Sequence, residues 1–228
     1  MKTYDLYLHS GPKMMKTYIH VPSLMGCILL RDTTDEAVTA APDVIRGFLA
    51  FLARSGERAD PSAPFRTRVA QHDKSGGFIG SNFLPTDAEP LLKRESDALM
   101  KRLAAIHGEL RAITSELSAK QLDAQPAKGR SIGRILIHLS GEGGYLRGVT
   151  GASRIQREIE VGSIAPLDGL DRIYELAVAR LAGMTDAERR EVVQRGQQPW
   201  SVRYAVRRML EHAWEHYAEI ATRLGQAP

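Results

Sequence analysis

The spacing of the hydrophobic residues changes near residue 85, and this change limits the possible folds more than any other feature of the chain. Before it, apolar residues alternate with more polar ones, as at Tyr4, Leu6 and Leu8, which is typical of a β-strand buried on one face. After it, apolar residues recur at every third or fourth position, as in amphipathic helices. The sequence therefore predicts an α+β protein, with strands and one helix in residues 1–85 and only helices in residues 86–228.

The first part is expected to be a small β-α domain. Its predicted strands are residues 4–8, 17–21, 26–30 and 65–70. Capping and acidic residues at Asp32–Glu36 predict the start of a helix that ends before Gly56. Residues 75–90 are rich in Gly, Ser, Asn and Pro, which is typical of a connection between domains. We place the domain boundary there, near residue 85.

The second part is expected to be a four-helix bundle, because it contains four segments with one apolar stripe each. These segments are residues 99–117, 132–146, 167–181 with an extension over 186–194, and 201–224. Glycines at positions 141, 143 and 144 fall inside the second segment. Since glycine costs about 1 kcal/mol in a helix interior relative to alanine, they indicate a close backbone approach or a broken helix end.

Three histidines lie beside the apolar stripes of these helices. His212 and His216 are four positions apart, which puts both imidazoles on one face of the last helix, and His138 flanks the stripe of the second helix. Three imidazoles can hold a divalent metal and leave a coordination position open for water or substrate. They accept zinc, nickel and iron alike, and we favour zinc or nickel. The alternative is a polar, pH-sensitive seam without metal.

Two further residues are candidates for chemistry beside these histidines. Glu142 follows His138 by one helical turn and is a candidate hydrogen-bond partner of a ligand, general base or fourth ligand, with a solvated surface residue as the equal alternative. Tyr145, one turn further on, is a candidate hydrogen-bond donor to a substrate. Both are therefore assigned as catalytic candidates.

The remaining histidines and the cysteine suggest no site. We expect His9 and His20 on the surface of strands, His72 in a loop, and His107 facing solvent beside the stripe of its helix. Cys27 follows a glycine in an apolar strand and is expected to be a buried structural thiol. A single cysteine excludes an intrachain disulfide.

The charge pattern argues against nucleic acid and membrane partners. The net charge is +4, but 31 basic and 27 acidic residues are interspersed, so no basic patch stands out. A local excess of arginine near the C-terminus is expected to be a solvated helix face, with an anionic substrate as the alternative. Its members are Arg189, Arg190, Arg195, Arg203, Arg207 and Arg208. The longest apolar run, residues 48–53, is too short to span a bilayer, and we expect a cytoplasmic protein.

Two sequence blocks contain the three histidines. One runs from Ser131-Ile132-Gly133 to Ile137-His138-Leu139, Glu142 and Tyr145-Leu146, and the second from Trp200-Ser201-Val202 to Glu211-His212 and Glu215-His216. Through these blocks, residues 88–224 resemble the DinB superfamily of helical-bundle metalloproteins. The resemblance implies that His138, His212 and His216 are metal ligands. It also implies a metal-dependent hydrolase or a transferase that uses a low-molecular-weight thiol.

The first part contains the stretch Val21-Pro22-Ser23-Leu24-Met25-Gly26-Cys27, then Asp32 to Ala37, then the helix that ends at Gly56-Glu57. Through these stretches, residues 1–80 resemble the HicB-like antitoxin fold. Because helices follow where such antitoxins usually have a DNA-binding segment, we expect the module to support homo-oligomerisation or to cover the cleft. The alternative to an enzyme acting on an unidentified small molecule is thus a non-enzymatic regulatory or stress-response binding protein. A nucleic-acid binder ranks third, and the sequence leaves open whether the chain is an enzyme.

Overall fold

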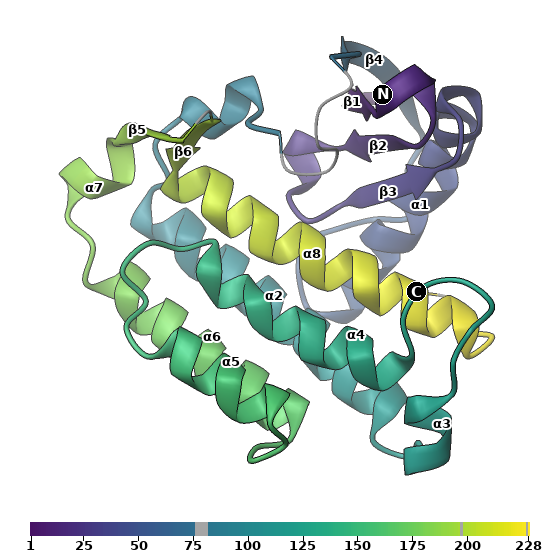
Figure 1. Cartoon of the computed structure of the whole chain (residues 1–228). Coiled ribbons are helices and arrows are strands. Elements are labelled where there is room, and N and C mark those ends of the chain that lie inside the picture. Colours follow the sequence, from purple (N-terminus) through teal and green to yellow (C-terminus); the bar gives the residue numbers. More distant parts are fainter. Residues whose placement is uncertain (76–81, 197, 227) are drawn as a thin grey trace.

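The structure, a computed structural model, describes residues 1–75, 82–196, 198–226 and 228. A small β-sheet with its own helix is followed by a helical part that makes up most of the chain (Figure 1). This arrangement confirms the predicted mixed α+β class and the order of its two parts. Within the described ranges, no helix combines the length and the apolar character needed to cross a membrane.

The sheet has four strands in the order β3-β2-β1-β4. They are β1 (Lys2–Ser10), β2 (Thr17–His20), β3 (Ile28–Arg31) and β4 (Phe65–Asp73), which confirms the four predicted strands. β2 pairs antiparallel with both β1 and β3, whereas β1 and β4 are parallel. A parallel pair needs a crossover connection, and helix α1 (Thr34–Arg54) is part of it. Thr33 caps this helix, since its side chain accepts a hydrogen bond from the backbone N–H of Glu36.

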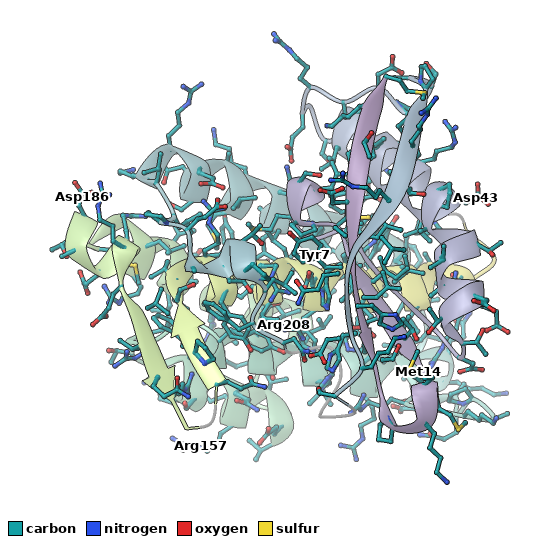
Figure 2. All side chains as sticks on the ribbon, turned by 90° about the horizontal axis from the view of Figure 1, so that it is seen from above. Tyr7, Met14, Asp43, Arg157, Asp186 and Arg208 are labelled. Carbon is teal, nitrogen blue, oxygen red and sulfur yellow. The ribbon has the colours of Figure 1, made fainter. Side chains whose placement is uncertain are left out.

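The two faces of the sheet are covered by different helices. Thr17 Oγ1 of β2 lies 2.9 Å from Thr34 Oγ1 at the start of α1, so the Thr17 side of β2 faces α1. Side chains alternate along a strand, and Tyr18 and His20 therefore point to the opposite face, toward helix α8 (Val202–Arg223). Figure 2 shows Asp43 of α1 and Arg208 of α8 on opposite sides of the strands.

Four helices of the second part pack against one another. α2 (Lys93–Thr114) contacts α6 (Pro166–Ala182) and α8, and α4 (Ile132–Leu139) contacts the same two helices. The shorter elements are η1 (Pro12–Met14), η2 (Pro22–Leu24), η3 (Pro85–Ala88), α3 (Ala119–Asp123), η4 (Ser140–Gly144), α5 (Ala152–Glu160), α7 (Asp186–Arg190), β5 (Val192–Arg195) and β6 (Gln198–Ser201). The predicted extension of the third helix over 186–194 is wrong, because α7 and the β5–β6 hairpin occupy this region.

The glycine-rich segment after α4 breaks the predicted second helix. α4 ends at Leu139, and the chain continues as the 3-10 turn η4 instead of running on to Leu146. A Cβ atom on Gly143 would lie 2.9 Å from Ile173 Cγ2 and 3.0 Å from Ala152 Cβ, so glycine allows η4 to touch both α6 and α5. Both readings of the glycines are therefore confirmed: a close approach and a broken helix end.

Helix α8 is buried around most of its circumference, because the N-terminal module covers one side and the other helices cover the rest (Figure 1). Trp214 marks the contact, with its ring 4.7 Å from Phe48 and 5.0 Å from Phe51, both on α1. One hydrophobic core runs through both parts of the chain. The predicted boundary near residue 85 falls at η3 and stays a prediction, and residues 76–81 of the predicted connection lie outside the described residues.

Candidate metal centre

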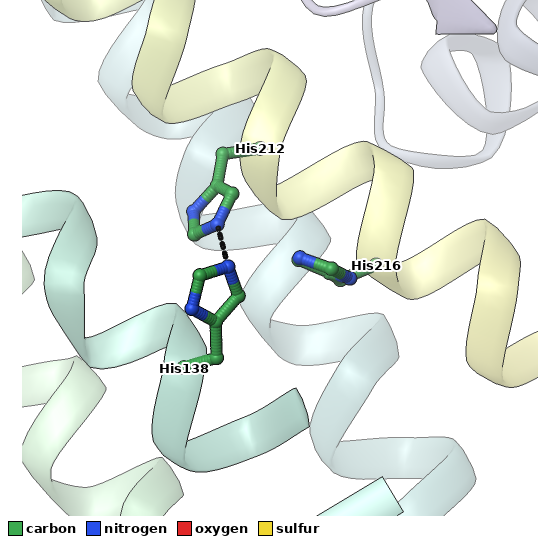
Figure 3. Close-up of side chains that lie close together, drawn as sticks. All are labelled: His138, His212 and His216. Atoms are coloured by element: carbon green, nitrogen blue, oxygen red, sulfur yellow. Dashed lines mark hydrogen bonds between the residues drawn. The ribbon is translucent and has the colours of Figure 1, made fainter. Parts of the chain in front are cut away.

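The structure brings together the three histidines singled out from the sequence. His138 extends from α4, and His212 and His216 extend from α8, so that the three rings face one another (Figure 3). The ring centroids are 4.9, 5.2 and 4.9 Å apart, which makes a nearly regular triangle. One nitrogen from each ring lies within 4.8 Å of the other two.

Local helix geometry explains how the histidines meet. On α8, residues four positions apart project from the same face about one turn, or 6 Å, apart. On α4, the Ser131 side chain caps the helix by accepting from the backbone N–H of Arg134. Because α4 packs against α8, His138 is presented to the gap between the other two rings.

The nitrogen atoms fit a divalent ion in number, type and spacing. Zinc binds imidazole nitrogen at about 2.0–2.1 Å, so the nitrogens around a tetrahedral ion lie about 3.3 Å apart. His138 Nε2 and His212 Nε2 are 3.1 Å apart, and the three nitrogens all lie within 4.8 Å of one another. His138 is exposed, whereas His212 and His216 are buried, so the cluster opens to solvent on the His138 side.

The surroundings keep two of the three imidazoles neutral. The side chain of His138 reaches solvent, but partial desolvation by the groups packed around the ring, and then the charges of Arg130 and His216, lower its pKa to about 4, against a smaller opposing effect of Glu219. Burial and the neighbouring histidines lower the pKa of His212 well below its usual range. Neutral imidazoles offer the lone pairs that a metal ion needs.

Glu219 is a candidate outer partner that the sequence did not suggest. His216 Nδ1 lies 3.0 Å from Glu219 Oε2. A carboxylate only accepts, so Nδ1 carries the proton and the lone pair of His216 resides on Nε2. The hydrogen bond from His216 is the largest influence on Glu219 and lowers its pKa. A glutamate three positions after a candidate ligand on the same helix is the pattern that would have indicated it.

Glu142 contacts α2 and, among the described residues, is not part of the three-histidine group. It is fully buried, and its Oε1 is 2.9 Å from Nε2 of His107, which is itself only 5% exposed. The expectation of a solvent-facing His107 and the alternative of a solvated Glu142 are both wrong. The helical spacing from His138 does not hold because η4 turns by about 120° per residue instead of about 100°.

Tyr145 does lie beside the cluster, as its sequence position suggested. Its ring centroid is 5.7 Å from that of His212, and the Arg208 guanidinium lies 5.5 Å from the ring centre. Trp200 Nε1 donates a 2.9 Å hydrogen bond to the Tyr145 carbonyl and anchors this segment to the β5–β6 hairpin. Tyr145 is half-buried, and it is the hydroxyl-bearing candidate that the sequence suggested for this site.

A buried polar network connects α8 to the sheet, which corrects several expectations. Arg207 is 1% exposed and forms ion pairs with Asp87 at 2.7 Å and with Glu211 at 2.6 Å, so it is not part of a solvated face. Arg208 is also buried and lies 3.0 Å from Glu211. His20, expected at the surface, is fully buried, and its Nδ1 lies 2.8 Å from Glu211 Oε1. The helix looks solvated in the sequence because the module that covers it comes from distant residues.

Of the other residues singled out from the sequence, some expectations are corrected and one is confirmed. Arg189 is buried too, and its guanidinium donates to Ser96 Oγ at 3.1 Å. His9 is 2% exposed instead of lying on the surface, and His72 lies in β4 with its Nε2 2.8 Å from Ser10 Oγ. Cys27 is buried as expected, and burial raises the pKa of its thiol.

Comparison of the chain with protein-family models, with curated proteins and with solved structures finds no match.

Proposed function

We propose that this chain is a DinB-like metal-binding protein, in which His138, His212 and His216 hold one divalent ion. The observation that carries the proposal is the convergence of three imidazole nitrogens from two helices within 4.8 Å. Zinc and nickel are the favoured ions, because both accept a set of neutral imidazoles. The sequence motifs around the three histidines support the DinB-like assignment independently of the geometry.

The chemistry that fits such a site is hydrolysis or transfer to a low-molecular-weight thiol. A bound divalent ion lowers the pKa of a coordinated water or thiol and leaves a position for a substrate. Tyr145 would orient the substrate beside His212, and the neighbouring Arg208 supplies a fixed positive charge. Glu142 is unsuited to the acid–base role, since its carboxylate contacts His107 in the interior.

A non-enzymatic binding protein that assembles through a HicB-like module is the second candidate. The observation in its favour is β4, a nine-residue strand at one edge of the sheet. Most of its residues are exposed, and within the described residues it pairs only with β1. Such an edge is a template for strand pairing with a second copy.

Metal content is the decisive measurement for the first candidate. We expect about one zinc or nickel ion per chain after loading and desalting, by elemental analysis. The His212→Ala/His216→Ala variant should retain none, whereas His72→Ala, which removes a histidine from the sheet, should bind like the wild type. A wild-type protein that retains no ion at neutral pH would overturn the proposed metal centre and favour the binding protein.

A further inference from the structure

Each candidate ligand on α8 directly follows a glutamate that β2 holds. Glu211 precedes His212, and Glu215 precedes His216. Tyr18 Oη donates a 2.7 Å hydrogen bond to Glu215 Oε1. One strand thus holds both glutamates, because His20 Nδ1 also lies 2.8 Å from Glu211 Oε1.

The spacing of these contacts follows from regular backbone geometry. Tyr18 and His20 are two positions apart on a strand, so their side chains leave the same face about 6.6 Å apart. Glu211 and Glu215 are four positions apart on a helix, about 6 Å along its axis. The spacing of the two side chains on β2 therefore matches the spacing of the two glutamates on α8. This match sets the position of α8 along its axis relative to β2.

This register also fixes how α8 is rotated. Neighbouring residues on a helix point about 100° apart, so each histidine has a set direction relative to the glutamate before it. When β2 holds Glu211 and Glu215 on its side, His212 and His216 turn toward α4 and His138 (Figure 3). A rotation of α8 that separated the nitrogens would have to break both contacts.

Charge makes the contact with β2 directional. Glu211 Oε2 forms ion pairs with Arg207 at 2.6 Å and with Arg208 at 3.0 Å, so Oε1 remains for the contact with His20 Nδ1. Burial and Glu215 raise the pKa of Tyr18, which therefore keeps its proton and donates it. An apolar contact would tolerate sliding, whereas these hydrogen bonds are lost after a shift of about 1 Å.

We propose that Tyr18 and His20 are positioning residues of the metal centre. Through Glu211 and Glu215, β2 sets the rotation of α8 and hence the spacing of the ligand nitrogens. The described residues of the N-terminal module contribute no ligand to the three-histidine cluster, but the module tunes the affinity and geometry of the cluster. This inference rests on the proposed metal centre and gives the module a role within it.

The test compares metal binding by matched variants. Tyr18→Phe removes only the hydroxyl, His20→Leu removes the second contact, and His20→Asn restores a donor at the place of Nδ1. Tyr7→Phe is the control, because it makes the same chemical change on the neighbouring strand, where Tyr7 pairs with His20 in the backbone register. Co²⁺ is the probe, since its visible absorption reports ligand geometry, and competition with a chelator gives the affinity.

We expect Tyr18→Phe/His20→Leu to weaken Co²⁺ binding about tenfold, the lower end of the range for outer-shell partners, and to change the absorption spectrum. Tyr18→Phe/His20→Asn should recover part of both effects, and Tyr7→Phe should match the wild type. If the first double variant does not fold, Tyr18→Phe alone must still weaken binding and change the spectrum. A folded variant that lacks these contacts but keeps the wild-type affinity and spectrum would overturn this inference and leave the proposed metal centre intact. A wild-type protein that binds no Co²⁺ would overturn the metal centre and the inference with it.

Discussion

His107 Nε2 lies 2.9 Å from Glu142 Oε1 in the interior of the helical part, and the two side chains are 5% and 0% exposed. The contact joins α2 to η4, the glycine-rich turn that precedes Tyr145. The 2.9 Å approach of Nε2 and Oε1 does not have the orientation of a hydrogen bond, and within the described residues neither side chain has another hydrogen-bond partner. The pair thus connects α2 to the turn that precedes Tyr145 through a contact that lacks hydrogen-bond geometry.

Replacing one member of this pair should cost more than replacing both. Glu142→Leu leaves the buried imidazole of His107 without its polar partner, and we expect a loss of about 1–3 kcal/mol in the free energy of unfolding. His107→Leu/Glu142→Leu removes both polar groups, and we expect it to be as stable as the wild type or more so. Urea unfolding followed by circular dichroism measures both. Additive losses in the double variant would show that the two groups do not interact.

Local patterns in the sequence were sufficient to predict most elements and the three-histidine cluster. Alternation of apolar residues located the strands, and the four-residue spacing of His212 and His216 placed both on one face of α8. The position of His138 followed from its place beside the stripe of a second helix. These features depend on periodicity within one element, which a sequence shows directly.

The environment of α8 could not be predicted in this way. Arg207, Arg208 and Glu211 look like a solvated face, because local periodicity does not show that a sheet from residues near the N-terminus covers it. Glu142 was misplaced for a different reason. The helix that carries His138 changes to 3-10 geometry at Ser140, and this change shifts Glu142, whereas Tyr145 still lies beside His212.

Unfolding of the N-terminal module and of the helices should occur as a single transition. Trp214 is 2% exposed and lies between Phe48 and Phe51, so it reports on the contact between the two parts. In a Trp200→Phe background, where Trp214 is the remaining one of two tryptophans, its fluorescence and the far-ultraviolet circular dichroism should change together. Trp214→Ala should cost about 3–5 kcal/mol in the free energy of unfolding. Two separate transitions in the wild-type protein would instead show that the predicted boundary near residue 85 divides independent units.

Two helical glycines should respond oppositely to alanine. A Cβ atom on Gly169 of α6 would lie 2.2 Å from Ile159 Cδ1, and Ile159 is 2% exposed, so Gly169→Ala should destabilise by about 1–3 kcal/mol through overpacking. Gly108 of α2 has nothing within 4 Å of the same atom, so Gly108→Ala should stabilise the protein by about 0.5–1 kcal/mol. The midpoint temperatures of thermal unfolding of both variants give the sign of each change in stability. A stabilising Gly169→Ala would contradict the close packing of α5 on α6.

Glu219 should affect metal binding through the tautomer of His216. The carboxylate accepts from Nδ1 of His216 and keeps Nε2 free for a metal ion. Glu219→Gln presents an amide that can also turn its N–H₂ group toward the ring, and this orientation favours a proton on Nε2 instead. We expect a loss of about tenfold to a hundredfold in zinc affinity, measured by competition with a chelator.

The matched control for this prediction is Glu160→Gln, which makes the same change at an exposed glutamate of α5. It should bind zinc like the wild type. Glu219 also forms an ion pair with Arg223, so a general effect on the end of α8 has to be separated from an effect on His216. Arg223→Gln removes that pair while leaving the carboxylate in place. If Arg223→Gln weakens zinc binding as much as Glu219→Gln does, the helix end and not the imidazole tautomer accounts for the loss.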